Sequence, residues 1–184
     1  LGNNRITTIS PKIKNLINLE ELDLSVNKIT ALPLEIGYLK KLSCLCLSNN
    51  NLCVISPEIG RLTNLITLDI AHNDISVLPT EIGRMTNLRT IYLHRNKINN
   101  LPAEIGNAIN LETIYLHYNK INMLPTEIGR LGQLITLNLS KNYIIRLPTE
   151  MSNMVTLNSL NLCDTPIDRL PIGFSQLTNL RLIM

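Results

Sequence analysis

The side chains of this sequence that could bind a metal or transfer a proton include three histidines, His72, His94 and His117. His94 and His117 are 23 positions apart, as are Tyr92 and Tyr115. A zinc site would need three or four ligands in a closed geometry, and no carboxylate shares the register of these imidazoles. The spacing therefore favours histidines that form hydrogen bonds over histidines that form a metal site.

A series of glutamates recurs at the same interval and could suggest paired catalytic carboxylates. Its members are Glu35, Glu58, Glu81, Glu104, Glu127 and Glu150. One glutamate at the start of each short helical turn would instead interact favourably with the helix dipole and face solvent. No nucleophile–base pair and no glycine-rich phosphate loop accompanies the series. We therefore expect no catalytic residue and no enzyme activity.

The thiols form a third set of candidates: Cys44, Cys46, Cys53 and Cys163. Cys44 and Cys46 are two residues apart on one face of a predicted strand, which is not the usual C-x-x-C spacing. With Asp69 and His72 close by, a redox or metal role stays open for this pair, although ordinary surface thiols are favoured. The cysteine clusters that close secreted repeat domains are missing, so we predict reduced thiols in a cytoplasmic protein.

The elements that must position these residues follow from an internal repeat of 23 residues. Each unit reads L-x-x-L-x-L-x-x-N-x-I-x-x-L-P-x-E-I-G-x-L-x-N. The first leucine of the unit recurs without insertion at Leu19, Leu42, Leu65, Leu88, Leu111, Leu134, Leu157 and Leu180.

The repeat predicts one domain over residues 1–184. It divides into a partial repeat at 1–18, full repeats at 19–41, 42–64, 65–87, 88–110, 111–133, 134–156 and 157–179, and a partial repeat at 180–184. Because both ends fall inside a unit and no polar capping coil is present, we expect the chain to be a fragment of a longer one.

Each unit contains the signals of one strand and one return segment. The leucines of the L-x-L core alternate with outward positions, which predicts a strand with its leucines inward. The asparagine that follows, as at Asn96, is expected to bond backbone groups of neighbouring coils. A proline then fixes the return turn, and the glycine of E-I-G disfavours a long helix. Thr165 replaces the asparagine in the seventh full unit and Pro166 follows it, so we expect a looser coil there.

Stacking such units buries a continuous core, which one unit alone could not do. The predicted fold class is therefore α/β: a solenoid curved as a horseshoe arc. We expect a parallel sheet on its concave face and short helical or 3₁₀ segments on its convex face.

The composition agrees with an aliphatic repeat and argues against several other functions. Of the 184 residues, 45% are hydrophobic but only 3% are aromatic, so aliphatic side chains must fill the interior. The net charge of +3 is spread along the chain, which argues against nucleic-acid binding. No apolar run approaches the roughly 18 residues that membrane insertion requires. No cofactor motif is present, so we expect no cofactor.

The unit from Asn27 to Leu42, N-K-I-T-A-L-P-L-E-I-G-Y-L-K-K-L, and its sister units resemble the Ras-group leucine-rich repeats. The shared L-P-x-E-I-G-x-L signature covers essentially the whole chain. This group includes animal scaffolds that bind Ras-type GTPases and type 1 protein phosphatase, fungal adenylyl cyclase repeats, and plant intracellular Ras-group proteins. The resemblance implies a cytoplasmic protein-interaction scaffold in signal transduction.

We therefore expect the chain to bind a partner protein on its concave face. The resemblance implies a Ras-type small GTPase or a phosphatase signalling complex as that partner. The alternative is that the chain is the recognition or regulatory arm of a larger multidomain enzyme or receptor, whose other domain lies outside it. We expect neither a nucleic-acid partner nor membrane insertion.

The expected binding site lies where the outward positions of the middle strands hold all three histidines and three of the five tyrosines. Tyrosine and arginine often dominate binding energy at interfaces, so Tyr92, Tyr115 and Tyr118 are expected to anchor the partner. Arg95 and Lys141 would pair with its acidic groups, and the histidines would supply pH-sensitive hydrogen bonds. The alternative is that the rings only cover the sheet. The predicted partner-binding residues are Asp69, His72, Tyr92, His94, Arg95, Tyr115, His117, Tyr118 and Lys141, beside an acidic rim at Glu20, Glu21 and Asp23.

Overall fold

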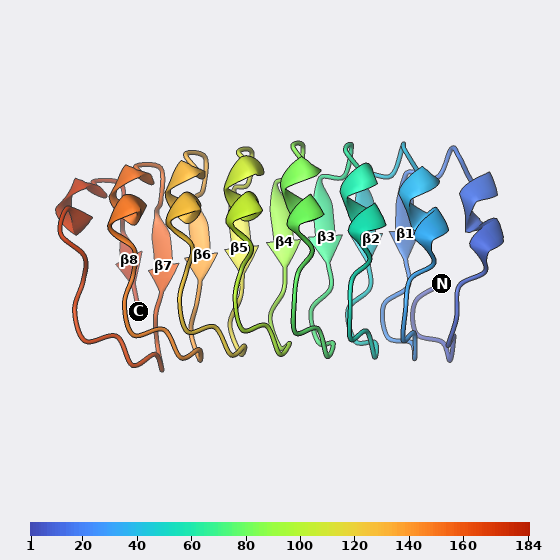
Figure 1. Cartoon of the computed structure of the whole chain (residues 1–184), viewed down its shortest axis with the longest axis horizontal. Coiled ribbons are helices and arrows are strands. Elements are labelled where there is room, and N and C mark those ends of the chain that lie inside the picture. The colour runs from blue at the N-terminus through green and yellow to red at the C-terminus, as the bar shows by residue number, and fades with distance from the viewer.

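The computed structural model describes all residues from 1 to 184 and forms a solenoid of stacked coils. The strands of successive coils lie side by side in one parallel sheet, and a short helical segment lies on the other side of each coil (Figure 1). The eight strands follow one another in chain order: β1 (Glu21–Asp23), β2 (Cys44–Cys46), β3 (Thr67–Asp69), β4 (Thr90–Tyr92), β5 (Thr113–Tyr115), β6 (Thr136–Asn138), β7 (Ser159–Asn161) and β8 (Leu182–Ile183). The predicted solenoid with a parallel sheet is confirmed.

Every helical segment is a 3₁₀ turn of at most five residues. In η4 the Ile82 N–H donates to the Pro79 carbonyl at 3.1 Å and the Met85 N–H donates to the Ile82 carbonyl at 3.2 Å, which is the i to i+3 pattern. The turns are η1 (Pro11–Asn15), η2 (Leu34–Tyr38), η3 (Pro57–Arg61), η4 (Thr80–Arg84), η5 (Ala103–Asn107), η6 (Thr126–Arg130), η7 (Thr149–Asn153) and η8 (Phe174–Gln176). The prediction of short return segments is confirmed in its 3₁₀ form.

Strand pairing follows the sequence repeat. Leu45 of β2 pairs with Leu68 of β3, which lies 23 positions later, and both side chains are fully buried. Cys44 and Cys46, on either side of Leu45, are half-buried, as the period of two along a strand requires. The buried apolar side chains form one cluster of 44 residues. One core therefore runs through the whole stack of coils.

A ladder of buried asparagines joins each coil to the coil before it. The Asn96 Oδ1 atom accepts from the Ile75 N–H of the preceding coil at 3.0 Å. Its Nδ2 atom donates to the Ile70 carbonyl of that coil at 2.9 Å and to the Leu93 carbonyl of its own coil at 3.1 Å. The predicted role of the asparagine column is therefore confirmed. The same bond to the preceding coil recurs at Asn27, Asn50, Asn73, Asn119 and Asn142.

The ladder stops at Thr165, where the sequence predicts a looser coil. The Thr165 hydroxyl donates to the Leu162 carbonyl of its own coil at 2.6 Å. One coil earlier, Asn142 accepts a hydrogen bond from the Ile121 N–H. The equivalent donor for Thr165 is the Ile144 N–H, and Thr165 accepts no hydrogen bond from it. The last two full coils are therefore joined by fewer polar contacts.

A backbone turn that the sequence analysis did not predict precedes each position of the ladder. There φ lies between +53° and +57°, the left-handed region that L-residues rarely adopt. Such a conformation costs about 1 kcal/mol per residue and persists because the structure around it fixes the turn. The residues are Asn3, Val26, Asn49, His72, Arg95, Tyr118, Lys141 and Asp164.

The glycine of the E-I-G stretch is required by the contact between coils. A Cβ atom on Gly83 would lie 2.3 Å from the Glu104 carbonyl oxygen of the next coil. Ser152 does have a Cβ at the equivalent position, and the residue opposite it is Gly173, where other coils have glutamate. A Cβ on Gly173 would lie 3.3 Å from that of Ser152. Glycine faces glutamate between the coils of η2 to η7, whereas Ser152 faces Gly173 here. One residue of each of these facing pairs is thus glycine, which lets the coils stay close.

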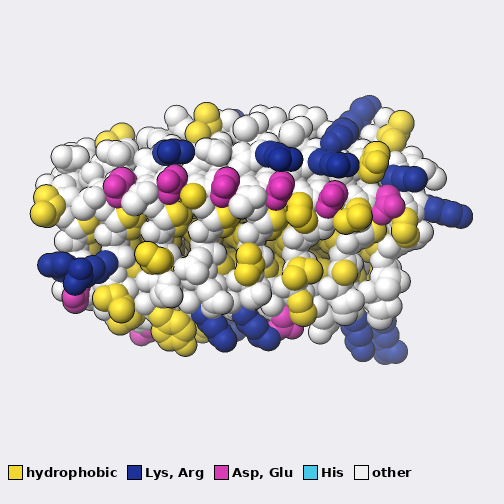
Figure 2. Space-filling model, viewed as in Figure 1, with side chains coloured by type: hydrophobic (Ala, Val, Ile, Leu, Met, Phe, Trp, Pro, Cys, Tyr) yellow, Lys and Arg dark blue, Asp and Glu magenta, His cyan; other side chains and the backbone are white.

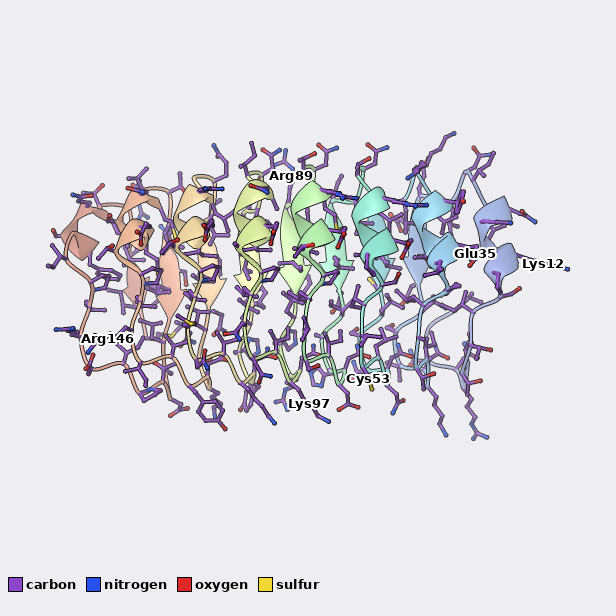
Figure 3. The ribbon with its side chains drawn as sticks, viewed as in Figure 1. Lys12, Glu35, Cys53, Arg89, Lys97 and Arg146 are labelled. Atoms are coloured by element: carbon purple, nitrogen blue, oxygen red, sulfur yellow. The ribbon has the colours of Figure 1, made fainter.

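The face formed by the 3₁₀ turns is polar and regular. Figure 2 shows a row of acidic side chains across it, with hydrophobic side chains below the row. Glu35 lies on this face, whereas Cys53, Lys97 and Arg146 lie toward the edge at which the strands end (Figure 3). Arg89 lies at the opposite edge, where the strands begin (Figure 3). The acidic row reflects one glutamate at the start of each 3₁₀ turn from η2 to η7.

Candidate functional site

Four of the predicted site residues form two stacked pairs on the sheet face. Tyr92 of β4 and Tyr115 of β5 are paired in register, and their rings are stacked with centroids 5.3 Å apart and planes at 5°. His94 and His117 follow the same two strands, and their imidazoles are stacked at 4.4 Å and 6°. The parallel register causes this geometry, because it places identical residue types directly beside each other.

Edge-to-face contacts join the two stacked pairs into one cluster. The rings of Tyr115 and His117 are 6.0 Å apart at 83°, and those of His72 and His94 are 5.4 Å apart at 82°. Tyr118 contacts His117 at 5.9 Å and 62°. Such T-shaped arrangements are favourable for aromatic rings. We call the group the ring cluster; it comprises His72, Tyr92, His94, Tyr115, His117 and Tyr118.

Two cations lie over the ring of Tyr118, one from each neighbouring coil. The Arg95 guanidinium carbon is 4.5 Å from the ring centroid and the Lys141 Nζ atom is 4.8 Å from it. Lys141 also pairs with Asp164 at 3.5 Å. The contact with Tyr118, together with Asp164, raises the pKa of Lys141. The Tyr118 side chain is 40% exposed, so this cation–π assembly forms an accessible edge of the ring cluster.

The imidazoles of the cluster are held in their neutral form. Burial, and then the neighbouring imidazole His94, lowers the pKa of His117 to about 4. Burial is also the main cause that lowers the pKa of His94 and of His72. Burial followed by the neighbouring Tyr115 raises the pKa of Tyr92, so its hydroxyl stays protonated. These histidines are therefore expected to become charged only in acid, at a lower pH than an ordinary histidine.

The two stacked histidines contain polar atoms that nothing in the chain satisfies. The Nδ1 atoms of His94 and His117 are buried and have no hydrogen-bond partner. A buried polar atom without a partner typically costs about 1–3 kcal/mol. Stability alone would not select this arrangement of two imidazoles on a solvent-facing sheet.

Asp69 is the one predicted site residue that takes no part in the ring contacts. It pairs in register with Cys46 on one side and Tyr92 on the other, and its Oδ1 atom accepts from the Ala71 N–H at 3.0 Å. No group of three or more histidine, cysteine, aspartate or glutamate side chains converges as metal ligands would. The cluster therefore offers neutral rings, hydroxyls and two cations to a ligand.

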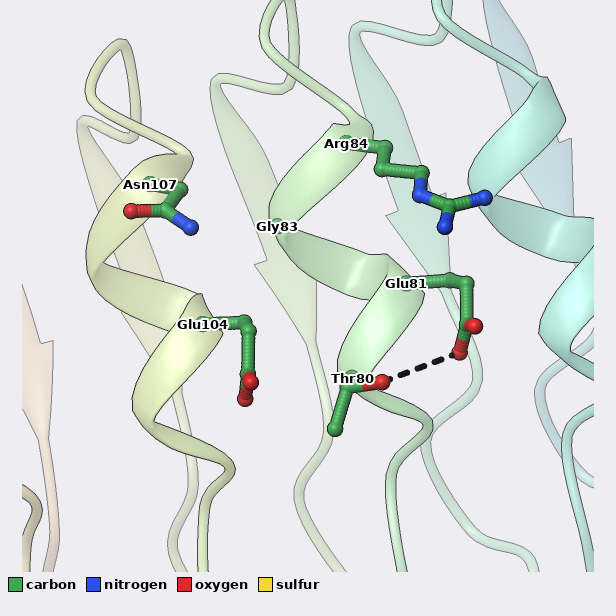
Figure 4. A pocket seen from close by; sticks show the side chains of 6 residues that line it. All are labelled: Thr80, Glu81, Gly83, Arg84, Glu104 and Asn107. Carbon is green, nitrogen blue, oxygen red and sulfur yellow. Dashed lines mark hydrogen bonds between the residues drawn. The ribbon is translucent and has the colours of Figure 1, made fainter.

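The glutamate series lies in a different environment. A hollow of about 270 Å³ between η4 and η5 is lined by Thr80, Glu81, Gly83, Arg84, Glu104 and Asn107 (Figure 4). The Thr80 hydroxyl donates to the Glu81 carboxylate at 3.2 Å. An equivalent hollow recurs two coils later at Thr126, Glu127, Gly129, Arg130, Glu150 and Asn153. Because it recurs beside the missing Cβ of glycine, we interpret it as a feature of coil packing.

Besides the Lys141–Asp164 pair, two more cross-coil ion pairs were not predicted from the sequence. Arg89 forms a salt bridge with Glu112 beside the starts of β4 and β5, and Lys97 pairs with Asp74 at 2.7 Å beyond the strand ends. Opposite charges spaced by 23 residues could have indicated both pairs. All four side chains are substantially exposed, so these pairs contribute little to stability.

The fold and its face together define the class of protein: a solenoid of 23-residue coils that presents a polar and aromatic parallel sheet. Family models agree with that class. Residues 80–184 match a leucine-rich repeat region, 40–98 match a leucine rich repeat, and 1–36 match a model of two leucine rich repeat copies. The chain belongs to the leucine-rich repeat family. These models are general ones and do not distinguish the Ras-group type.

Solved structures show the same architecture. The chain is similar to the leucine-rich repeat protein LIC12759 of Leptospira interrogans, with 32% identity and a TM-score of 0.71 over 97% of this chain and 52% of that one. It is also similar to the ectodomain of the Arabidopsis thaliana membrane receptor kinase GASSHO1/SCHENGEN3, solved in complex with CASPARIAN STRIP INTEGRITY FACTOR 2, with 33% identity and a TM-score of 0.84 over 96% of this chain and 22% of that one.

Internalin C2 of Listeria monocytogenes is a third similar structure, with 27% identity and a TM-score of 0.85 over 99% of this chain and 77% of that one. The chain thus spans about half the length of the Leptospira protein and about a fifth of the plant ectodomain. A search of curated proteins found no match. None of the helical segments has the length and apolar character to cross a bilayer.

Proposed function

We propose that this chain is a protein-interaction module that binds its partner on the sheet face, with the ring cluster, Arg95 and Lys141 at the centre of the contact. The observation that supports this proposal most directly is the contiguous set of aromatic rings on an otherwise ring-poor protein. Receptor and internalin structures of the same fold support a protein-interaction role in general.

The physical argument is preorganisation. The tyrosines and histidines lie at the ends of paired strands or just after them and contact one another, so a partner would not have to order them on binding. Tyr118 presents an apolar ring, a hydroxyl and two adjacent cations, which is the combination that often dominates interface energy. Asp69 and the acidic rim at Glu20, Glu21 and Asp23 would contribute charge complementarity at the margin of the contact.

The partner class is a narrower proposal. The resemblance to Ras-group repeats favours a Ras-type GTPase or a phosphatase signalling complex in the cytoplasm, with no catalysis by this chain itself. Arg95 and Lys141 are suited to acidic groups on such a partner. We also propose a division of residues 1–184 into seven full repeats and two partial ones. In this division the ring cluster, apart from His72, lies within the two full repeats at 88–110 and 111–133.

A second candidate is the recognition arm of a larger receptor or enzyme. The similarity to the plant receptor kinase ectodomain favours it, since this chain would correspond to about a fifth of that ectodomain. Sequence on either side of the chain distinguishes the two: capping coils favour the scaffold, and a kinase, GTPase or ligase domain favours the arm.

Affinity capture from cell lysate tests the proposal. The parent chain is compared with the variant Tyr92→Ala/Tyr115→Ala/Tyr118→Ala, and circular dichroism verifies that both are folded. Tyr38→Ala is a matched control, because Tyr38 is 53% exposed on η2, away from the sheet. We expect one protein to be retained by the parent and the control and lost by the triple variant. Equal retention by all three would reject the sheet face as the binding surface.

A further inference from the structure

The two cysteines of β2 form a pair that the ring cluster does not use. Cys44 and Cys46 flank the buried Leu45, and their Sγ atoms are 3.8 Å apart on the sheet face. Both side chains are half-buried, whereas Cys53 and Cys163 are exposed single thiols. The strand therefore holds two accessible sulfur atoms a short distance apart.

Three acidic residues occupy the positions in register with this pair on the neighbouring strands. Glu21 of β1 is in register with Cys44, and Asp23 of β1 and Asp69 of β3 are in register with Cys46 on its two sides. Burial, followed by the neighbouring Cys44 thiol and then the two aspartates, raises the pKa of Cys46 to about 12. A thiol in this environment is a poor nucleophile near neutral pH. The same negative surroundings favour a cation that can displace the thiol protons.

We propose that Cys44 and Cys46 bind a soft monovalent cation, Cu(I), through both sulfur atoms. A Cu(I) ion with two thiolate ligands prefers a nearly linear S–Cu–S arrangement, so two bonds slightly shorter than the zinc–thiolate length of about 2.3 Å span roughly 4.4 Å. The observed separation of the Sγ atoms is 3.8 Å. The two sulfur atoms must therefore move apart by roughly 0.6 Å to hold one ion, which small rotations about the Cα–Cβ bonds of Cys44 and Cys46 supply.

The choice of Cu(I) follows from the number of ligands. Thiolates select Cu(I), zinc or iron–sulfur clusters. Structural zinc sites and iron–sulfur clusters are bound by four protein ligands, and no third side chain converges on this pair. A closed-shell cation that accepts two thiolates is the species that this site can satisfy. On binding, each S–H group releases its proton to solvent and two Cu–S bonds form, with no change in the oxidation state of sulfur or copper.

Anaerobic titration with Cu(I), in competition with the chromophoric chelator bicinchoninate, tests the proposal. The background variant Cys53→Ser/Cys163→Ser removes the two single thiols and is expected to bind one Cu(I) per chain as tightly as the parent. Adding Cys46→Ser to that background should lower the affinity about 100-fold or more, a loss at least as large as that from changing an outer-shell partner. Circular dichroism of each variant verifies the fold. Binding should strengthen as pH rises, because two protons are released.

Two results would overturn the assignment. One is equal Cu(I) affinity with and without Cys46→Ser, which would place the ion elsewhere. The other is Zn(II) binding as tightly as Cu(I), which would require ligands beyond the two thiolates. Asp23→Asn tests the surrounding charge and is expected to weaken Cu(I) binding by about two- to fivefold. An unchanged affinity in that variant would overturn the part assigned to the carboxylates.

Discussion

The coils that contain β5 and β7 follow the same backbone path but are joined to their neighbours by different polar groups. Asn119, after β5, accepts from the Ile98 N–H at 3.0 Å and donates to the Leu93 carbonyl at 3.0 Å, and both partners belong to the preceding coil. Thr165, after β7, bonds only within its own coil. Strand pairing is nevertheless continuous through both coils. Strand pairing and the apolar core therefore suffice to determine the backbone path of a coil, and the asparagine stabilises that path.

The largest expected effect comes from removing the asparagine where it is present. Asn119→Ala should lower the free energy of unfolding by about 2–4 kcal/mol, because the buried Ile98 N–H loses its acceptor and two carbonyls each lose a donor. Thr165→Ala should cost about 1 kcal/mol or less, since one local hydrogen bond is lost. Urea unfolding followed by circular dichroism measures both. Equal losses would show that the ladder contributes no more than a local bond.

Placing serine at the glycine position of the coil of β5, as Ser152 does in a later coil, tests whether that glycine is required. In Gly129→Ser the new Cβ would lie 2.3 Å from the Glu150 carbonyl oxygen, and the expected loss of unfolding free energy is about 1–3 kcal/mol. Gly132→Ser is the matched control in the same coil, because a Cβ there meets no atom within 4 Å. Thermal unfolding of the two variants gives the comparison. A Gly129→Ser variant as stable as the control would mean that the coils can separate at no cost.

Restoring the ladder in the coil of β7 should have a smaller effect of opposite sign. Thr165→Asn places an acceptor where the Ile144 N–H lacks one, and is expected to raise the free energy of unfolding by about 1 kcal/mol. Urea unfolding against the parent measures the gain. No gain would indicate that Pro166 keeps the backbone of this coil away from the geometry found at Asn142.

The smallest expected effect is on pH dependence. His117 has a folded-state pKa of about 4, below the usual value of 6.5, so the unfolded chain takes up a proton first as the pH falls. The contribution of the neutral imidazole to the free energy of unfolding is fully present above about pH 6.5 and is lost as the pH falls toward about 4. Because the ring is partly solvated, the loss should be about 1 kcal/mol or less.

Unfolding midpoints measured across this pH range check the assignment. His117→Gln should give a flatter pH dependence than the parent. Cys163→Gln changes the residue at the same register in the coil of β7 and should leave the slope unaltered. Parallel curves for the parent and His117→Gln would contradict the depressed pKa of His117.

The coil path could be predicted because its determinants are local and recur every 23 residues. The leucine columns, the asparagine and the proline each predict one step of the path, and their repetition removes the ambiguity of a single short segment. The ladder bond at Asn96 and the missing one at Thr165 followed from the chemistry of the side chains alone. The face occupied by Tyr92 and Tyr115 followed from the alternation along a strand.

The remaining features depend on distances between coils, which no single repeat encodes. The left-handed turn occurs at residues as different as Val26 and Tyr118, so residue type gives no signal for it. The glycine at Gly83 could be interpreted as a helix breaker until the carbonyl of the next coil was placed beside it. The neutral state of His117 comes from burial by neighbouring rings, which the sequence alone does not measure.

The asparagine ladder also has a direction along the chain. Each amide bonds groups 21 and 26 positions earlier, as Asn119 does with Ile98 and Leu93. During translation, a coil leaving the ribosome would therefore lack its closing hydrogen bonds until nearly one more repeat had been synthesised. Each new coil would complete the one made just before it, so that growth of the chain and consolidation of the solenoid advance in the same direction.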